Sequence, residues 1–315
     1  ESITTLEDVR FEGNGHGTSG AALFMSANSR ATCNKCVFDN NWCESRGGAI
    51  SIFSRANLNT TNSIFTNNNS STGASIYATD STYQSHFGSF FSNNSAKSHG
   101  AAIHVSEYAY LGVEASFFSD NVAEVSPGGA IVFEDFTTGL LVDTIFSRNS
   151  APNGGALYVG GRVELQSYRN IFVNNFAFNG GGAVYADLMS NTTWISCVCT
   201  YNFADVYGGC LYAADRSNFS IADSSFENNA AVSGGGAIYQ SDTTTFDIRN
   251  SSMTANQADN GGAILLLGDV SFHITECTFE HNIAKDSGGA LMNTNNNDVL
   301  LDTVRFSNNS AMNGG

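Results

Sequence analysis

The sequence contains little positive charge. Its 13 lysine and arginine residues stand against 29 aspartate and glutamate residues, which gives a formal net charge of −16. Nucleic acids and anionic lipid surfaces attract proteins through clustered basic side chains, so this balance argues against binding to either. No apolar run reaches the length that crosses a bilayer, and we expect no membrane insertion in this segment. An acidic, lysine-poor chain rich in Ser, Asn and Thr is typical of a secreted, soluble protein.

Strong helix formers are also scarce, because Ser, Asn, Gly, Thr and Phe dominate the composition. Apolar residues recur two apart, as in Phe219 and Ile221 or Phe246 and Ile248, which is the spacing of a β-strand. Short strands separated by Gly and Asn turns account for this pattern. The sequence therefore predicts an all-β protein.

One phrase, Phe-x-x-Asn, recurs along the whole chain at intervals of 26–28 residues. Its first position is occupied in turn by Phe11, Phe38, Phe65, Phe91, Phe118, Phe146, Phe172, Cys199, Phe226, Met253, Phe279 and Phe306. Asn follows three residues later in all twelve copies, and a Gly-Gly-Ala-Ile type phrase begins eight to ten residues after the first position. Length alone favours about two domains, but the unbroken period makes residues 1–315 one solenoid.

A parallel β-helix with one coil per repeat fits this period. Three short strands and three turns fill 26–28 residues, so we expect about twelve coils, which extend roughly 55 Å at about 4.8 Å per coil. The crossover rule predicts a right-handed superhelix. Because the chain begins within one coil and ends within another, we expect a slice of a longer solenoid, in which further coils cover the terminal sheet edges.

Each repeated position has a predicted role in the coil. The Phe column stacks ring over ring in the lumen, and Cys199 and Met253 keep that column apolar. The Asn column is expected at a turn with left-handed backbone, with its amides hydrogen-bonded to the Asn above and below. Gly-Gly-Ala marks a tight corner with little room for a Cβ atom.

The paired phrases, as in FDNNWCESRGGAI at 38–50 and FENNAAVSGGGAI at 226–238, resemble the repeats of the chlamydial polymorphic outer-membrane proteins. The resemblance covers essentially the whole chain and implies a surface-exposed, adhesive β-helix. Similar repeats occur in large surface proteins of unicellular eukaryotes. Since a fold does not fix an activity, the resemblance identifies a type of repeat rather than one function.

The chain carries eight Asn-x-Ser/Thr sequons. They lie at Asn59, Asn68, Asn69, Asn93, Asn191, Asn218, Asn250 and Asn308. The repeat register places Asn68 in the Asn column, where we expect it to be buried and a poor acceptor of glycan. In a eukaryotic secretory pathway N-linked glycans are expected, and the candidates are Asn59, Asn93, Asn191, Asn218, Asn250 and Asn308.

The seven cysteines are grouped by coil. They are Cys33, Cys36 and Cys43 in the second coil, Cys197, Cys199 and Cys210 in the eighth, and Cys277. The register turns them towards the lumen, where they would pack as small apolar residues. An oxidising compartment would also allow a bridge within a coil, from Cys199 to Cys210 or from Cys36 to Cys43. The phrase Cys-Asn-Lys-Cys has no second pair at zinc-site spacing, so we predict no metal site.

The main rival to a structural protein is a carbohydrate-active β-helix enzyme. Such an enzyme needs two or three carboxylates, or a base with acids, on adjacent coils of one face. The best adjacency is Asp143 beside Arg169, which more often forms a surface ion pair. A column of Glu44, Glu124, Asp205 and Asp259 skips coils, and the six His are scattered. We therefore predict no catalytic residue and no cofactor.

Two outward columns are candidate partner surfaces. The first lies just before the Phe column and comprises Val37, Ile64, Phe90, Phe117, Ile145, Ile171 and Val198. It is either an exposed apolar stripe for a partner or a stripe that the next turn covers. The second comprises Tyr77, Tyr158, Tyr185, Tyr212 and Tyr239, which would bind sugars or protein, or pack across strands.

These observations predict a non-catalytic extracellular rod within a large cell-surface, wall or filament glycoprotein, such as a hair-like appendage. Its partners would be other extracellular proteins or copies of itself, assembled laterally or end to end. One alternative is the passenger of a bacterial autotransporter-type adhesin, which the resemblance supports. The second alternative is a polysaccharide lyase or hydrolase.

Overall fold

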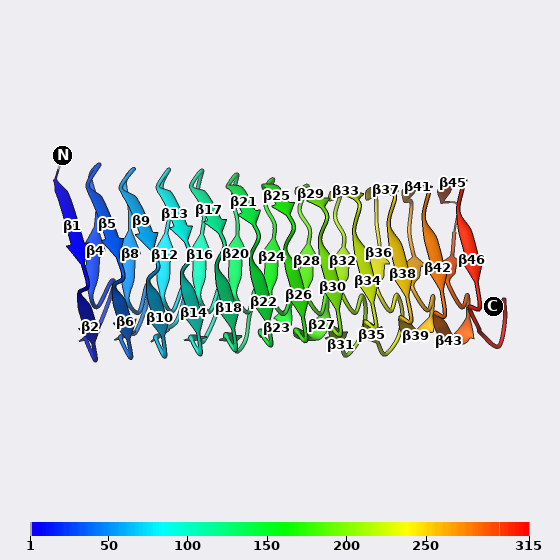
Figure 1. Ribbon diagram of the computed structural model, residues 1–315, viewed down its shortest axis with the longest axis horizontal. Coiled ribbons are helices and arrows are strands. Elements are labelled where there is room, and N and C mark those ends of the chain that lie inside the picture. The colour runs from blue at the N-terminus through cyan, green and yellow to red at the C-terminus, as the bar shows by residue number, and fades with distance from the viewer. Residues whose placement is uncertain (1, 296, 315) are drawn as a thin grey trace.

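The computed structural model describes residues 2–295 and 297–314, which form a stack of coils along one axis (Figure 1). The first eleven coils each contribute one strand to each of four parallel sheets, and the last coil adds β45 and β46 to two of them, which gives two sheets of twelve strands and two of eleven. The chain is an all-β parallel β-solenoid, as the repeat predicts. Its right-handed sense stays a prediction.

Sheets 1 and 2 hold the first two strands of each coil, with five and three residues per strand. Sheet 1 contains β1 (Ile3–Glu7), β5 (Arg30–Asn34), β9 (Asn57–Thr61), β13 (Tyr83–Phe87), β17 (Tyr110–Glu114), β21 (Thr138–Val142), β25 (Glu164–Tyr168), β29 (Asn191–Ile195), β33 (Asn218–Ala222), β37 (Thr245–Arg249), β41 (Ser271–Thr275) and β45 (Asp298–Asp302). Sheet 2 contains β2 (Arg10–Glu12), β6 (Val37–Asp39), β10 (Ile64–Thr66), β14 (Phe90–Ser92), β18 (Phe117–Ser119), β22 (Ile145–Ser147), β26 (Ile171–Val173), β30 (Val198–Thr200), β34 (Ser225–Glu227), β38 (Ser252–Thr254), β42 (Thr278–Glu280) and β46 (Arg305–Ser307).

Sheets 3 and 4 complete each coil. Sheet 3 contains β3 (Gly15–His16), β7 (Trp42–Cys43), β11 (Asn69–Ser70), β15 (Ser95–Ala96), β19 (Val122–Ala123), β23 (Ser150–Asn153), β27 (Phe176–Gly180), β31 (Phe203–Ala204), β35 (Ala230–Ala231), β39 (Gln257–Asn260) and β43 (Ile283–Ser287). Sheet 4 contains β4 (Leu23–Met25), β8 (Ile50–Ile52), β12 (Ile76–Ala78), β16 (Ile103–Val105), β20 (Ile131–Phe133), β24 (Leu157–Val159), β28 (Val184–Ala186), β32 (Leu211–Ala213), β36 (Ile238–Gln240), β40 (Ile264–Leu266) and β44 (Leu291–Asn293).

The prediction of three strands per coil is wrong, since each coil has four. The corners on either side of sheet 2 use only two residues, such as Asn62 and Ser63 before β10 and Asn67 and Asn68 after it. One residue of each pair takes a positive φ, 49° at Asn62 and 55° at Asn67, which turns the chain sharply. Because these corners are so short, the strands on either side of them look like one continuous strand in the sequence.

The Phe column fills the lumen as predicted. Adjacent rings from Phe38 to Phe91 are parallel, with centroids 4.7 Å apart. The stack is interrupted where Cys199 replaces Phe, and there Trp194 from sheet 1 lies between the rings of Phe172 and Phe226. The larger indole therefore replaces the missing phenyl volume, as dense packing of the core requires.

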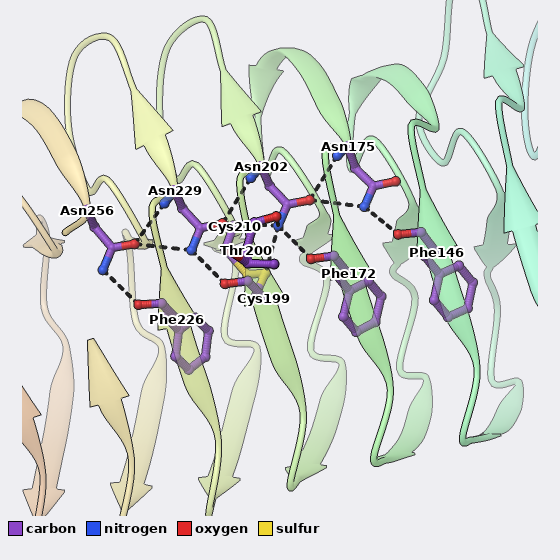
Figure 2. Close-up of a disulfide and its surroundings, with 10 residues drawn as sticks. All are labelled: Phe146, Phe172, Asn175, Cys199, Thr200, Asn202, Cys210, Phe226, Asn229 and Asn256. Carbon is purple, nitrogen blue, oxygen red and sulfur yellow. Dashed lines mark hydrogen bonds between the residues drawn. A yellow bond between two sulfur atoms is a disulfide. The ribbon is translucent and has the colours of Figure 1, made fainter. Parts of the chain in front are cut away.

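The Asn column forms a ladder from Asn14 to Asn309, and Figure 2 shows its steps from Asn175 to Asn256. Asn202 donates its Nδ2 to Asn229 Oδ1 at 3.0 Å and to the Phe172 carbonyl at 2.9 Å. Its backbone amide donates to the same Oδ1 at 3.1 Å. The prediction of left-handed backbone at these Asn is wrong, because the preceding residue, such as Tyr201, takes the positive φ and turns the amide inward. The buried side-chain amides of the ladder are thereby paired from coil to coil.

A second ladder, missed in the sequence, occupies the position two before the Phe column. Ser89 Oγ accepts from the Ser63 amide at 3.3 Å and donates to the Phe87 carbonyl. Cys197, at the same position, bonds its backbone amide to Ser224 Oγ at 3.1 Å. Most coils hold a small hydroxyl or thiol residue here, and in one coil Asn170 takes the position, where its Oδ1 accepts from the Thr144 amide at 2.8 Å.

The Gly-Gly phrase sits where the chain enters sheet 4. The first glycine of each pair has a positive φ, 65° at Gly208, and a Cβ on Gly209 would collide with the Gly236 carbonyl in the next coil. The segment before this corner folds back over the outer face of sheet 4, since the ring of Tyr207 stacks on Tyr239 with centroids 4.3 Å apart. Sheet 4 is therefore covered on both faces.

Candidate functional site

The apolar residues just before the Phe column lie in one line on the outer face of sheet 2. The parallel register pairs Ile64 with Phe90 and Phe90 with Phe117. Ile64 and Phe90 are 39% and 52% exposed. The half-buried members are Val37, Phe117, Ile145, Ile171 and Val198. No member is buried, so the following turn does not cover this column.

A second apolar column, missed in the sequence, faces the first across the corner between sheets 1 and 2. Phe87 is 47% exposed at the end of β13, and Val142, Tyr168 and Ile195 hold the same register position in later coils. The period-two alternation of the strands was the signal that places them outward. We call the two columns together the corner surface.

The corner becomes polar beyond the eighth coil. A groove of about 310 Å³ continues along it. Its lining residues are Ser196, Cys197, Val198, Asp223, Ser224, Ser225, Asn250, Ser251, Ser252, Glu276 and Thr278. The apolar character of the corner surface is therefore confined to the first eight coils.

The Tyr column faces outward from sheet 4 but lies beneath the covering segment. Tyr77, Tyr158 and Tyr239 are buried, and Tyr185 and Tyr212 are half-buried. Tyr185 stacks on Tyr212 with centroids 4.6 Å apart. Burial raises the pKa of Tyr158, Tyr185 and Tyr239, so these phenols are neutral. The column supplies packing between coils and offers no ring face at Tyr158 or Tyr239 to a sugar.

Two carboxyl groups at the edge of the Tyr column have raised pKa values. Burial raises the pKa of Glu134 to about 7, and the neighbouring Asp135 and Asp187 add to the shift. Burial raises the pKa of Asp187 to about 6, although the Tyr158 hydroxyl, which donates at 2.8 Å, opposes that shift. Glu134 and Asp187 stand two coils apart with Gly160 between them, which is wider than the carboxylate spacing of a retaining glycosidase.

An open groove of about 600 Å³ lies along the turns that join sheet 4 to sheet 1. It is lined by Leu188, Met189, Asp215, Arg216, Asp242, Thr243, Gly268 and Asp269. Its carboxylates come from three successive coils. Sequence reasoning missed this groove because the turn residues belong to no repeated phrase.

The adjacency of Asp143 and Arg169 is a surface ion pair. Arg169 donates two hydrogen bonds of 2.7 Å to the two carboxylate oxygens of Asp143. This contact lowers the pKa of Asp143, and both side chains are largely exposed. Within residues 2–295 and 297–314, no group of three or more His, Cys, Asp or Glu could hold a metal ion. None of the described residues forms a helix long and apolar enough to cross a membrane.

The sequons divide by exposure. Asn68 is buried, and its Nδ2 donates to Asn94 Oδ1 at 3.0 Å and to the Phe38 carbonyl. The six glycosylation candidates Asn59, Asn93, Asn191, Asn218, Asn250 and Asn308 are all exposed. Each therefore presents its amide to solvent, as an acceptor of glycan must.

One disulfide is present among the described residues. It joins Cys199 in sheet 2 to Cys210 at the entry to sheet 4, with Cα atoms 6.3 Å apart (Figure 2). Cys36 and Cys43 are free and buried, so the second candidate bridge is not formed. Burial raises the pKa of Cys33 to about 12, and it also raises the pKa values of Cys197 and Cys277. These thiols pack in the lumen as inert small residues.

The chain resembles known proteins through its repeats. The Chlamydia polymorphic membrane protein repeat matches residues 35–52, 88–106, 143–160 and 223–241. No curated protein matches the chain. The structure of the surface protein and adhesin PfbA of Streptococcus pneumoniae aligns over 98% of this chain and 90% of that one, with 6% identity and a TM-score of 0.27. The chain is thus a β-solenoid built from repeats of the Chlamydia polymorphic membrane protein type.

Proposed function

We propose that this chain is a non-catalytic, extracellular rod within a large cell-surface, wall or filament glycoprotein. The observation that carries the proposal is the unbroken Asn ladder, which links the coils from Asn14 to Asn309. Backbone bonds in four sheets accompany it, so bending the rod would strain all of them at once. Repeats of the polymorphic membrane protein type support the surface location.

The rod serves adhesion or lateral assembly. Its corner surface repeats the same apolar contact from coil to coil, and repeated contacts raise avidity without any single strong site. Other extracellular proteins and copies of the chain are the partners that such a surface fits. The exposed sequons support a glycosylated exterior.

The even length of the coils supports a non-catalytic role. Coil lengths of 26–28 residues leave no long loop to build a substrate cleft. An assay for release of unsaturated or reducing ends from a panel of acidic and neutral polysaccharides tests this part. We expect no turnover above that of a buffer control. Measurable turnover that Glu134→Gln or Asp187→Asn abolishes would show that the chain is an enzyme and contradict the proposal.

Surface location is tested on intact source cells with an antibody raised against this chain. We expect labelling without permeabilisation, and removal of the signal by brief external protease treatment. Labelling that requires permeabilisation would contradict the proposal.

The second candidate is a passenger of a bacterial-type adhesin, which the four matched repeats favour. Glycopeptide mass spectrometry of the native protein separates the two. Glycan on Asn93, Asn250 or Asn308 with Asn68 bare would support the eukaryotic glycoprotein. Absence of glycan at every sequon would favour the bacterial adhesin.

A further inference from the structure

The turns that join sheet 4 to sheet 1 contain large apolar residues in an unfavourable backbone conformation. In the turns of the first eight coils two consecutive residues have positive φ, from Ala27 and Asn28 to Asp215 and Arg216. At Tyr108, Phe136, Leu188 and Met189 the φ values are 62°, 62°, 51° and 63°. Side chains of this size disfavour the left-handed region, so local conformational preference does not account for them.

Burial in the core does not account for these four residues either. Tyr108 is 66% exposed, Leu188 48%, Phe136 43% and Met189 41%. Each therefore costs stability in the turn and returns little burial in the core. Strained, exposed apolar residues that cluster on one surface are a mark of a binding site. We call these four residues, together with Arg162 between them, the turn ridge.

The backbone aligns the turn ridge along the axis of the rod. The Tyr108 amide donates to the Asp135 carbonyl at 3.0 Å, and the Phe136 amide donates to Gly161 at 2.8 Å. In the next coil the Arg162 amide donates to the Leu188 carbonyl at 2.9 Å. These bonds hold successive side chains one coil apart, in a line that leads into the 600 Å³ groove beginning at Leu188 and Met189.

The ring geometry favours a protein partner over a sugar. Tyr108 and Phe136 stack with centroids 5.0 Å apart and planes 11° apart. The Arg162 guanidinium covers the ring of Phe136 at 5.3 Å. Both faces of Phe136 are thus occupied within the chain, and a sugar binds aromatic rings through their faces. The ring edges that remain suit aliphatic side chains.

Charge identifies the partner further. Beyond Leu188 and Met189 the groove presents Asp215, Asp242 and Asp269 against the single Arg216. The whole chain has a formal net charge of −16, so a second copy would meet its own sign. A basic partner is complementary to both the groove and the chain.

We infer that the turn ridge and the adjoining groove bind an extended segment of a different protein. That segment places aliphatic side chains against Tyr108, Phe136, Leu188 and Met189, and lysine or arginine over Asp215, Asp242 and Asp269. The inference rests on the proposed adhesive function and adds to the corner surface a second surface with one partner chemistry.

The test measures binding of three synthetic peptides of equal length to the purified chain by interferometry. The peptides alternate leucine with lysine, serine with lysine, and leucine with glutamate. We expect the leucine–lysine peptide to bind at least about tenfold more tightly than the other two, because it alone supplies both chemistries. Equal affinities, or no binding of the leucine–lysine peptide, would overturn the inference.

A variant of the ridge tests the surface itself. Tyr108→Asn, Phe136→Asn, Leu188→Asn and Met189→Asn combined should lower affinity for the leucine–lysine peptide to that of the serine–lysine peptide. Its thermal midpoint should be unchanged or higher, because Asn tolerates positive φ. A midpoint several degrees lower would assign these residues to folding instead.

The matched control removes apolar side chains of similar exposure from sheet 3, by Val122→Ser, Phe203→Ser and Ile283→Ser. It should bind the leucine–lysine peptide as the wild-type chain does. Loss of binding in this control alone would overturn the inference and leave the adhesive rod standing. Sedimentation velocity tests the remaining alternative. If the wild-type chain forms a dimer and the ridge variant does not, the ridge binds a second copy of the chain, which would overturn the choice of partner.

Discussion

At the scale of the residue, the side chain of one ladder asparagine makes within the protein the hydrogen bonds that it would otherwise make with water. Asn121 Oδ1 accepts from the amide and the Nδ2 of Asn94 at 3.1 Å and 2.9 Å. Its Nδ2 donates to the Phe91 carbonyl at 3.0 Å and to Asn149 Oδ1 at 2.9 Å. No other side chain of this volume offers both an acceptor and two donors in that geometry. The invariance of Asn along the ladder follows from this requirement.

Replacing one ladder residue should therefore be costly. Asn121→Ala leaves the Asn94 amide and the Phe91 carbonyl buried without that partner, and we expect a loss of about 3 kcal/mol in the free energy of unfolding. Urea denaturation followed by circular dichroism measures it. Asn69→Ala, at an exposed position of sheet 3, is the control and should cost little. Equal losses in the two variants would show that the ladder bonds contribute no special stability.

A buried histidine makes the lumen sensitive to acid. His86 packs edge-on against the stacked rings of Phe65 and Phe91, with Thr60 Oγ1 at 2.7 Å from its Nδ1. Burial lowers the pKa of His86 to about 3. The unfolded chain takes up this proton near pH 6.5, whereas the folded chain resists it, so stability falls as the pH drops from about 6.5 towards 3.

The His86→Val variant should lose less stability on acidification than the wild-type chain. The difference at about pH 4 should reach at most about 3 kcal/mol, the value of the proton that the folded state excludes. Denaturation curves at pH 7 and pH 4 measure both chains, and His104, whose pKa is also lowered to about 3, remains in each. Parallel losses in the two chains would assign the acid sensitivity to groups other than His86.

At the scale of the element, the disulfide joins two sheets that otherwise meet through side chains. Cys199 replaces a lumen phenylalanine in β30, and its bond to Cys210 ties sheet 2 to the entry of β32. Trp194 from β29 fills the volume beside it, so packing and cross-link coincide in the eighth coil. The bond closes a segment with a sequence separation of 11. It limits the freedom of the unfolded chain in the coil where the Phe stack is broken.

Reduction should lower the stability of the chain by about 3 kcal/mol, the value typical of a short closed segment. Thermal melts with and without a phosphine reductant measure the effect. The double variant Cys199→Ser, Cys210→Ser should melt lower than the wild-type chain and show no response to reductant. A Cys43→Ser variant, which alters a free thiol, should keep the response. An unchanged wild-type melt under reductant would contradict a structural role for the bond.

The columns could be predicted from the sequence, whereas the number of sheets could not. The positions of Phe38 and Asn41 could be predicted because a buried ring and a buried amide each recur at one fixed position of the repeat. The fourth strand was not predicted because corners of only two residues separate β10 from its neighbours. Corners this short do not stand out as turns in the sequence. The turn ridge escaped for a different reason. Tyr108 and Phe136 occupy a turn position whose residue type varies from coil to coil, as Arg55 and Ser81 show, and no periodic rule places apolar residues there.

At the scale of the whole molecule, each coil contacts only its neighbours. Parallel pairing in all four sheets joins one coil to the next and to no other. Stability in such a solenoid is close to a sum of coil terms and interface terms. Any complete coil is then exchangeable, provided that the ladder and the Phe stack stay in register.

Deleting one complete coil should therefore shorten the rod without unfolding it. Removal of residues 146–171 joins Ile145 to Phe172 and brings Asn121 next to Asn175 in the ladder, because both asparagines follow their column position by the same three residues. We expect a folded chain, shorter by about 4.8 Å, with β-sheet circular dichroism and a cooperative melt. Small-angle X-ray scattering measures the length. Removal of residues 146–158 alone cuts within the coil, places inward residues outward and should prevent folding. If both deletions fold equally well, or both fail, coil register is not what specifies the rod.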